Sequence, residues 1–134
     1  MAKPEQRMWE ALRPVMKPLD PVRIESGATG SGIPDVNYVA GWVELKAAER
    51  WPPREGPLRV DHFTTEQRTW LRRRNLAGGK AFLLLKVGKS EWLLFDGRVA
   101  AACLGEFTRA QLYEVALARW SRLPRTGELT KCLL

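Results

Sequence analysis

Three charged side chains, Asp35, Glu44 and Lys46, have types and a spacing that suit the hydrolysis of a phosphodiester bond. Carboxylate oxygens are the ligands that Mg²⁺ prefers in proteins, and Mn²⁺ is expected to substitute for it. A metal ion in such a site activates a water molecule, and a nearby ammonium group orients the water and offsets charge on the phosphate. This chemistry requires the three side chains to meet on one surface.

The chain around these residues has the pattern of a β-hairpin. Two strand-like runs, 36–39 and 42–47, meet at a tight turn at Ala40-Gly41. A symmetric turn gives the pairs Val39–Trp42, Tyr38–Val43, Asn37–Glu44, Val36–Leu45 and Asp35–Lys46. Because side chains alternate between the two faces of a strand, the three charged groups then share one face. The residues alone also permit a second interpretation, in which this face is simply the solvated side of a half-buried hairpin.

The order Pro34-Asp35 followed by Glu44-Leu45-Lys46 resembles the signature of PD-(D/E)XK nucleases. The spacing and the later Gln67 are most similar to the virus-type replication-repair nucleases (VRR-NUC) and to the archaeal Holliday-junction resolvases. The resemblance covers about residues 4–95. It implies an α/β fold with a restriction-endonuclease-like core, αβββαβ, in which helices flank a mixed sheet.

The resemblance also implies roles for individual residues. Asp35, Glu44 and the backbone carbonyl of Leu45 would hold Mg²⁺, and Lys46 would orient or help to deprotonate the attacking water. Gln67 would reach toward the scissile phosphate or the water. Gln67 also stands three residues after Thr64, as in a capping box, so a purely capping role remains the alternative.

A third acidic residue of the site has two candidates. Glu5 precedes the apolar residues Met8 and Trp9 by three and four positions, so it projects at the edge of the inward face of a helix, whereas Glu10 falls on the solvent side. The resolvases carry a first-helix glutamate in this context, and Glu5 matches it. Glu25, on a short strand, is the competing candidate.

The remaining pattern predicts the elements that must position these side chains. We expect a helix over 4–13, a strand over 22–26, a helix that opens at 64–67 and stops at Gly78-Gly79, strands over 81–87 and 92–95, a helix over 108–122 and a frayed end over 125–134. The run 81–87 is almost continuously apolar, which is typical of a strand buried on both faces. The chain is expected to be a single domain, 1–134, with a core over about 4–95 and a helical extension over 108–122.

Several residues are candidates for contact with nucleic acid. Arg54 lies in a basic, proline-rich loop over 49–61, and Ser26 opens a loop of small residues that lets a backbone approach a phosphate. The 64–77 helix adds a dense positive surface. The predicted contacts are Arg54, Ser26, Arg68, Arg72, Arg73 and Arg74.

Composition restricts the function classes. The formal net charge of +7 favours a polyanionic partner. Two cysteines do not make a disulfide framework, and a single histidine argues against zinc. The longest apolar runs are far shorter than the roughly 20 residues that a bilayer requires. We therefore expect a cytoplasmic protein, of a bacterial cell or phage-encoded.

The functional hypothesis is a Mg²⁺-dependent endonuclease of phage or bacterial replication and repair, acting on branched DNA as the resemblance implies. Symmetric cleavage of a four-way junction needs two sites and hence a homodimer. The alternative is a basic binding module that holds nucleic acid without cutting it. Two carboxylates aimed at a polyanion oppose that alternative unless a metal ion lies between them.

Overall fold

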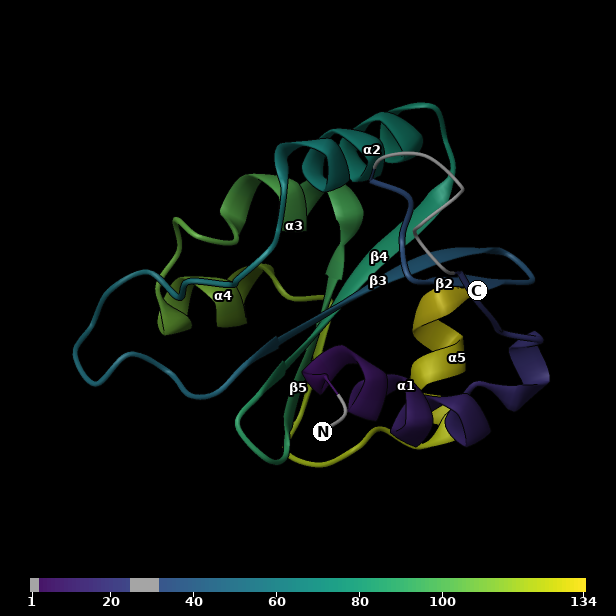
Figure 1. Ribbon diagram of the computed structural model, residues 1–134, viewed down its shortest axis with the longest axis horizontal. Coiled ribbons are helices and arrows are strands. Elements are labelled where there is room, and N and C mark those ends of the chain that lie inside the picture. Colours follow the sequence, from purple (N-terminus) through teal and green to yellow (C-terminus); the bar gives the residue numbers. More distant parts are fainter. Residues whose placement is uncertain (1–2, 25–31) are drawn as a thin grey trace.

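The computed structural model describes residues 3–24 and 32–134. Figure 1 shows one sheet with helices on both of its faces. The elements in chain order are α1 (Pro4–Val15), the 3₁₀ helix η1 (Lys17–Leu19), β1 (Val22–Arg23), β2 (Val36–Tyr38), β3 (Gly41–Ala48), α2 (Thr65–Leu76), β4 (Lys80–Val87), β5 (Glu91–Asp96), α3 (Gly97–Cys103), α4 (Arg109–Val115), β6 (Ala118–Trp120) and α5 (Thr126–Leu133). The α/β class and the order αβββαβ through β4 agree with expectation.

The six strands lie in the order β1 to β6, so each strand neighbours the next one in the chain. β3 and β4 are parallel, and the other four pairs are antiparallel. A parallel pair needs a crossover connection, which the loop after β3 and α2 provide. β4 is central, and its side chains alternate between two apolar cores, which explains its continuous apolar run.

The two cores lie on the two faces of the sheet. α1 and α5 cover one face through residues such as Leu12 and Leu129. α2, α3 and α4 cover the other through residues such as Leu71 and Leu112 (Figure 1). The two faces of β3 therefore meet different helices, which decides the surroundings of every side chain on that strand.

The β2–β3 hairpin has a different register from the expected one. Tyr38 pairs with Gly41, so the connection is Val39-Ala40 and the register is shifted by two residues. A Cβ on Gly41 would lie 2.2 Å from the carbonyl oxygen of Lys80. Gly41 is thus required inside the strand, against β4, and not at the corner of the turn. A shift of two residues leaves every side chain on its expected face.

The helix expected over 108–122 is wrong beyond Val115. The chain leaves α4 and forms β6 on the free edge of β5, with the Leu117 N–H donating to the Leu94 carbonyl (2.8 Å). The unpaired backbone groups of that edge favour a strand, although Trp120 lies at a helical spacing from the apolar residues of α4.

α3 was also not expected. A Cβ on Gly97 would lie 2.8 Å from the Ala81 carbonyl, so glycine lets the chain turn from β5 straight into α3.

The end of the chain is not frayed. It forms α5, whose Leu129 and Leu133 are buried against the sheet, and the Tyr38 hydroxyl donates to the Leu133 carbonyl (2.6 Å). We expected Val22 and Ile24 to point inward, and this is wrong at Val22, which is 51% exposed on the edge strand β1. Glu25 and Ser26, expected to continue that strand, lie outside the described residues. In the described part of the chain, no helix is both long and apolar enough to cross a membrane.

The packing of α5 predicts that Leu129→Ala destabilises the protein. The substitution removes a buried side chain and leaves a cavity, so we expect a loss of about 2–5 kcal/mol in the free energy of unfolding. Leu134→Ala is the matched control, because Leu134 is exposed. Urea unfolding of both variants measures the difference, and equal stabilities would show that α5 adds little to the fold.

Candidate active site

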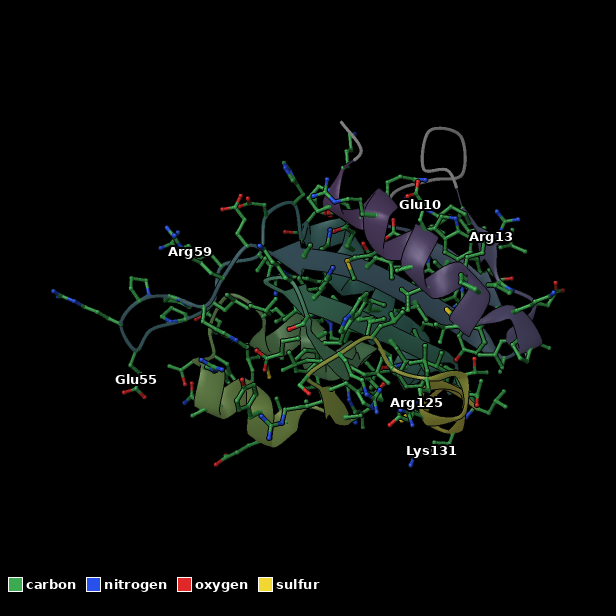
Figure 2. All side chains as sticks on the ribbon, turned by 90° about the horizontal axis from the view of Figure 1, so that it is seen from below. Glu10, Arg13, Glu55, Arg59, Arg125 and Lys131 are labelled. Carbon is green, nitrogen blue, oxygen red and sulfur yellow. The ribbon has the colours of Figure 1, made fainter. Side chains whose placement is uncertain are left out.

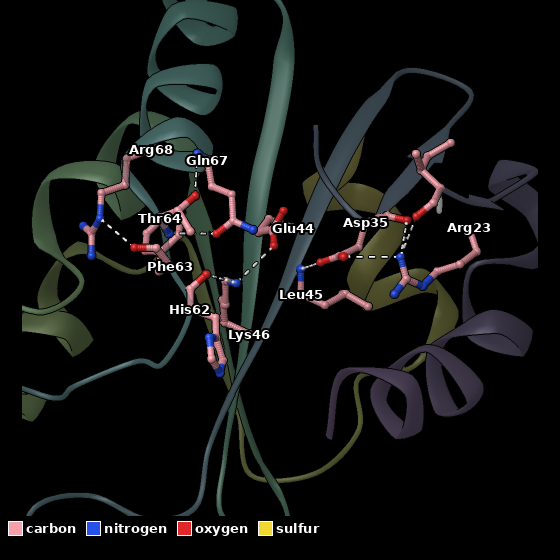
Figure 3. Close-up of polar contacts among 11 residues, drawn as sticks. Arg23, Asp35, Glu44, Leu45, Lys46, His62, Phe63, Thr64, Gln67 and Arg68 are labelled. Carbon is pink, nitrogen blue, oxygen red and sulfur yellow. Dashed lines mark hydrogen bonds and ion pairs between the residues drawn. The ribbon is translucent and has the colours of Figure 1, made fainter. Parts of the chain in front are cut away.

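Asp35, Glu44 and Lys46 lie together beside the β2–β3 hairpin (Figure 3). Val36 pairs with Val43, so one further step of the register sets Asp35 opposite Glu44. Lys46 Nζ lies 3.4 Å from Glu44 Oε2. The hairpin therefore brings two carboxylates and one ammonium group to one place on the face that packs against α2.

Glu44 is the most constrained of the three. Only 2% of the surface of Glu44 is exposed to solvent, and its Oε1 has no hydrogen-bond partner among the described residues. Burial raises the pKa of Glu44 well above its usual range, and the charge of Asp35 raises it further, against the opposing effect of Lys46. A buried carboxylate oxygen without a partner is costly, so the site favours either a proton or an additional cation at this point.

Lys46 is also buried, at 3% exposure. Its Nζ donates to the His62 carbonyl (3.0 Å) and lies 5.7 Å from the centre of the Phe63 ring. Figure 3 shows the ammonium group between Glu44 and His62. An ammonium group has three N–H donors, and these contacts with Glu44 and His62 use two of them. His62 contributes its backbone carbonyl here, from a turn with a left-handed φ of 62°.

Asp35 has a cationic partner that the sequence pattern did not indicate. Arg23 Nη1 donates to Asp35 Oδ1 (3.2 Å) and to the carbonyls of Asp35 (3.1 Å) and Ile24 (2.8 Å). The other carboxylate oxygen, Oδ2, accepts from the Leu45 N–H (2.8 Å). These bonds fix the orientation of the carboxylate. The sequence signal for Arg23 was weak, a single charge between the apolar Val22 and Ile24.

The donor set of the site fits Mg²⁺. The antiparallel pairing of β2 with β3 ends at Val36–Val43, and the nearby Pro34 has no N–H to offer the Leu45 carbonyl. Among the residues that the structure describes, no group of three or more His, Cys, Asp or Glu side chains is placed to hold a metal ion. The fit therefore uses the carboxylates of Asp35 and Glu44, backbone oxygen and water. Mg²⁺ commonly takes one or two carboxylates and keeps several waters.

Gln67 forms the capping box of α2. Its backbone N–H donates to Thr64 Oγ1 (3.2 Å), and its Oε1 accepts from the Thr64 N–H (3.0 Å). Gly32 packs against the same turn, since a Cβ there would lie 2.4 Å from the Glu66 carbonyl oxygen. The capping interpretation thus accounts for the side-chain oxygen of Gln67, while the side-chain NH₂ takes no part in the box.

The candidates for a third acid lie elsewhere. Glu5 is half-buried and Glu10 is exposed, as the helical phase predicts (Figure 2 labels Glu10). α1 covers the sheet face opposite to Glu44, and Glu5 lines a cleft of about 640 Å³ with Ala47 and His62 beyond β3. Glu5 can thus approach the site only around the carboxyl end of β3. Glu25 lies outside the described residues.

Arg68 points into the protein rather than toward solvent. Its Nη1 donates to the Ala101 carbonyl of α3 (2.9 Å), and its guanidinium lies 4.2 Å from the centre of the Phe63 ring. Burial lowers the pKa of Arg68 from its ordinary value. These contacts give Arg68 a structural role, in which it holds the turn whose His62 carbonyl binds Lys46.

The other predicted basic contacts differ in their surroundings. Arg72 and Arg73 are exposed on α2, and Arg54 is exposed on the loop after β3. Arg74 is exposed but stacks on Trp70, with the guanidinium 4.3 Å from the ring centre. Ser26 lies outside the described residues.

Comparison with known proteins reveals a likeness in structure. No protein-family model matches the chain, and no curated protein matches it in sequence. The 1.6 Å structure of Archaeoglobus fulgidus Hjc, a Holliday junction resolvase from an archaeal hyperthermophile, matches with a TM-score of 0.57 and 14% identity, over 97% of this chain and 98% of that chain. This chain has the fold of that resolvase. The expected restriction-endonuclease-like fold is thereby confirmed, and the match also runs through the C-terminal part that the sequence resemblance did not reach.

Within this resolvase fold, the raised pKa of Glu44 predicts a pH-dependent stability in the absence of divalent metal. The folded state keeps the Glu44 proton at pH values where the unfolded chain, with an ordinary pKa near 4.5, has lost it. Wild type therefore loses stability as the pH rises above 4.5 through the folded-state pKa. Glu44→Gln has no such proton to lose, so its stability relative to wild type should increase as the pH rises above about 4.5.

Urea unfolding with a chelator at several pH values measures this difference. Glu10→Gln, at an exposed position, serves as the control and should show no such trend. A Glu44→Gln difference that stays constant or decreases with pH would contradict the electrostatic account of the site.

Proposed function

We propose that this protein is a Mg²⁺-dependent DNA endonuclease that cleaves branched DNA as a Holliday-junction resolvase. One observation carries the proposal: Asp35, Glu44 and Lys46 converge on one face, with a buried carboxylate oxygen of Glu44 that lacks a partner among the described residues. The likeness of the fold to a Holliday junction resolvase supports the choice of substrate. The net charge of +7 supports a polyanionic partner.

In this proposal Asp35, Glu44 and the Leu45 carbonyl hold Mg²⁺. The metal would act as a Lewis acid toward the phosphate and lower the pKa of a bound water. Arg23 and the Leu45 N–H hold the Asp35 carboxylate in its orientation beside Glu44. The N–H of Lys46 left over from Glu44 and His62 orients the water or binds a phosphate oxygen.

The proposal assigns the remaining predicted residues assisting, DNA-contacting or indirect roles. Glu5 assists only from the end of β3, and Gln67 only through its side-chain NH₂. Arg54, Arg72 and Arg73 are proposed contacts to the DNA backbone because they are exposed. Arg68 is proposed to act indirectly, by fixing the turn that binds Lys46.

The competing hypothesis is a binding module without catalysis. The burial of Glu44 next to Asp35 argues against it, since a binder gains nothing from two crowded carboxylates beside its polyanion. A resolvase also needs a second active site for symmetric cleavage, so we propose a homodimer on a four-way junction.

The test is a cleavage panel of linear, flapped and four-way-junction DNA, with Mg²⁺ and with excess chelator. We expect metal-dependent cleavage with preference for the branched substrates. Lys46→Met keeps the apolar length of the side chain but removes the ammonium, and it should slow single-turnover cleavage by about 10²-fold or more. Lys86→Met, on the neighbouring strand β4, is the matched control and should remain active. Full activity in chelator, or an unaffected Lys46→Met, would overturn the proposal.

The basic surface of α2 predicts a change in salt dependence. Arg72→Gln combined with Arg73→Gln should weaken DNA binding and reduce the slope of log K against log salt by up to about 0.9 for each phosphate that is no longer neutralised. The bond that is cut should not change. Arg13→Gln combined with Lys131→Gln removes the same charge from exposed positions on α1 and α5 and serves as the control (Figure 2). Equal slopes for the two double variants would show that the α2 pair makes no specific contact.

A further inference from the structure

A second cavity lies between the loop after β3 and helix α4. Its volume is about 340 Å³, and we call it the aromatic cavity. Trp51 and Tyr113 line it, together with two prolines and the start of α4. Arg54, Glu55, Arg109 and Ala110 also line it. Figure 1 shows the loop passing beside α4 on the side of the molecule away from α1.

One carboxylate fixes both aromatic rings. The Trp51 indole N–H donates to Glu91 Oε1 (2.8 Å), and the Tyr113 hydroxyl donates to Glu91 Oε2. The two rings stand edge to face, with centroids 5.6 Å apart. The polar group of each ring is thus satisfied by β5, and the rings are held in place before any ligand arrives. Such preorganisation favours binding, because little side-chain freedom is lost on association.

Cationic groups surround the rings. Arg109 lies 5.1 Å from the centre of the Trp51 ring, and Arg119 lies 3.8 Å from the centre of the Tyr113 ring. Arg54 also lines the cavity. Glu55, at the tip of the loop (Figure 2), is the one acidic residue among the described residues that line it. Arg109 also lies 3.8 Å from Glu91 and donates to the Tyr113 hydroxyl (2.7 Å). The cavity therefore combines apolar ring and proline surfaces with the exposed cation of Arg54, which complements a ligand that has a flat apolar part and an anionic part.

The cavity is within reach of the proposed cleavage site. Its loop begins after β3, which carries Lys46, and leads into His62, whose carbonyl binds Lys46. Trp51 follows Lys46 by five residues, so their Cα atoms are at most about 18 Å apart. Stacked nucleotides of one strand advance about 3.4 Å each, so about five nucleotides span that distance.

We propose that the aromatic cavity binds one unpaired nucleobase of the DNA substrate, with its phosphate near Arg54. The inference rests on the proposed nuclease function and adds to it a site that reads single-stranded character near a branch point. A cavity of this size, with aromatic walls and a few charged groups, suits a small flat ligand. Stacking of bases on aromatic side chains, next to cations that bind the backbone, is the general means of holding single-stranded DNA.

The experiment compares two branched DNAs that differ only in a single-stranded arm of ten nucleotides. One arm is all thymidine and the other is all abasic, so the phosphates are identical. Binding is measured in Ca²⁺, in which we expect binding with little turnover because its longer and more flexible coordination positions water poorly. Wild type should bind the thymidine arm about 5- to 150-fold more tightly, the range for stacking of one base.

Ala110→Trp tests the cavity without removing its walls. Ala110 lines the cavity at an exposed position of α4, so a bulky side chain fills the space while the Trp51–Glu91 bond stays intact. This variant should lose the preference for the thymidine arm and keep its affinity for the abasic arm. Ala102→Trp, at an exposed position of α3 that does not line the cavity, is the matched control. Trp51→Leu should behave like Ala110→Trp if its melting temperature is retained.

The outcomes separate this inference from the proposed function. Equal binding of the two arms by wild type, or an unchanged preference in Ala110→Trp, overturns the base site and leaves the nuclease proposal intact. Cleavage of a fully paired four-way junction should be the same in wild type and Ala110→Trp. A wild type that prefers the thymidine arm but never cleaves would instead overturn the nuclease function alone.

Discussion

The structure around the site depends on the burial of Glu44 between a second carboxylate and one ammonium group. Two like charges in a poorly solvated place repel strongly, and Lys46 offsets only part of that repulsion. Strand β3 nevertheless fixes the carboxylate there, since its neighbouring side chains Val43 and Leu45 are anchored in the opposite core. The fold thus holds an arrangement that is unfavourable by itself and that a divalent cation would relieve.

The parallel pairing of β3 and β4 determines how this arrangement is enclosed. A parallel neighbour requires a crossover, and the crossover takes the chain from Ala48 out through the proline-rich loop and back along α2. The return passes directly over Lys46, where the His62 carbonyl accepts its N–H. The same connection therefore supplies the partner of the ammonium group, the basic face of α2 and one wall of the aromatic cavity.

The arginines of the protein divide into two groups by what they touch. Arg23, Arg68 and Arg109 contact carboxylates, carbonyls or aromatic rings of the protein itself, and they fix the orientation of other side chains. Arg72 and Arg73 are exposed on α2. Net charge alone cannot separate these groups, because a guanidinium that stacks on a ring counts the same as one that meets solvent.

The sequence by itself determined what depends on local patterns. Alternation along the hairpin fixed the shared face of Asp35, Glu44 and Lys46. The continuous apolar run predicted the central strand β4, and the capping box at Thr64 marked the start of α2. These features involve neighbours within a few residues, where spacing decides geometry.

Only the tertiary structure decided what depends on distant partners. The hairpin register depends on the close approach of Lys80 to Gly41, and β6 forms because the edge of β5 is free to pair. Helix α5 is held by the burial of Leu129 and Leu133 against the sheet. The pairing of Arg23 with Asp35 and the inward position of Arg68 belong to the same class. Each arises between segments far apart in the chain, so no local spacing encodes it, and only the packed sheet makes it favourable.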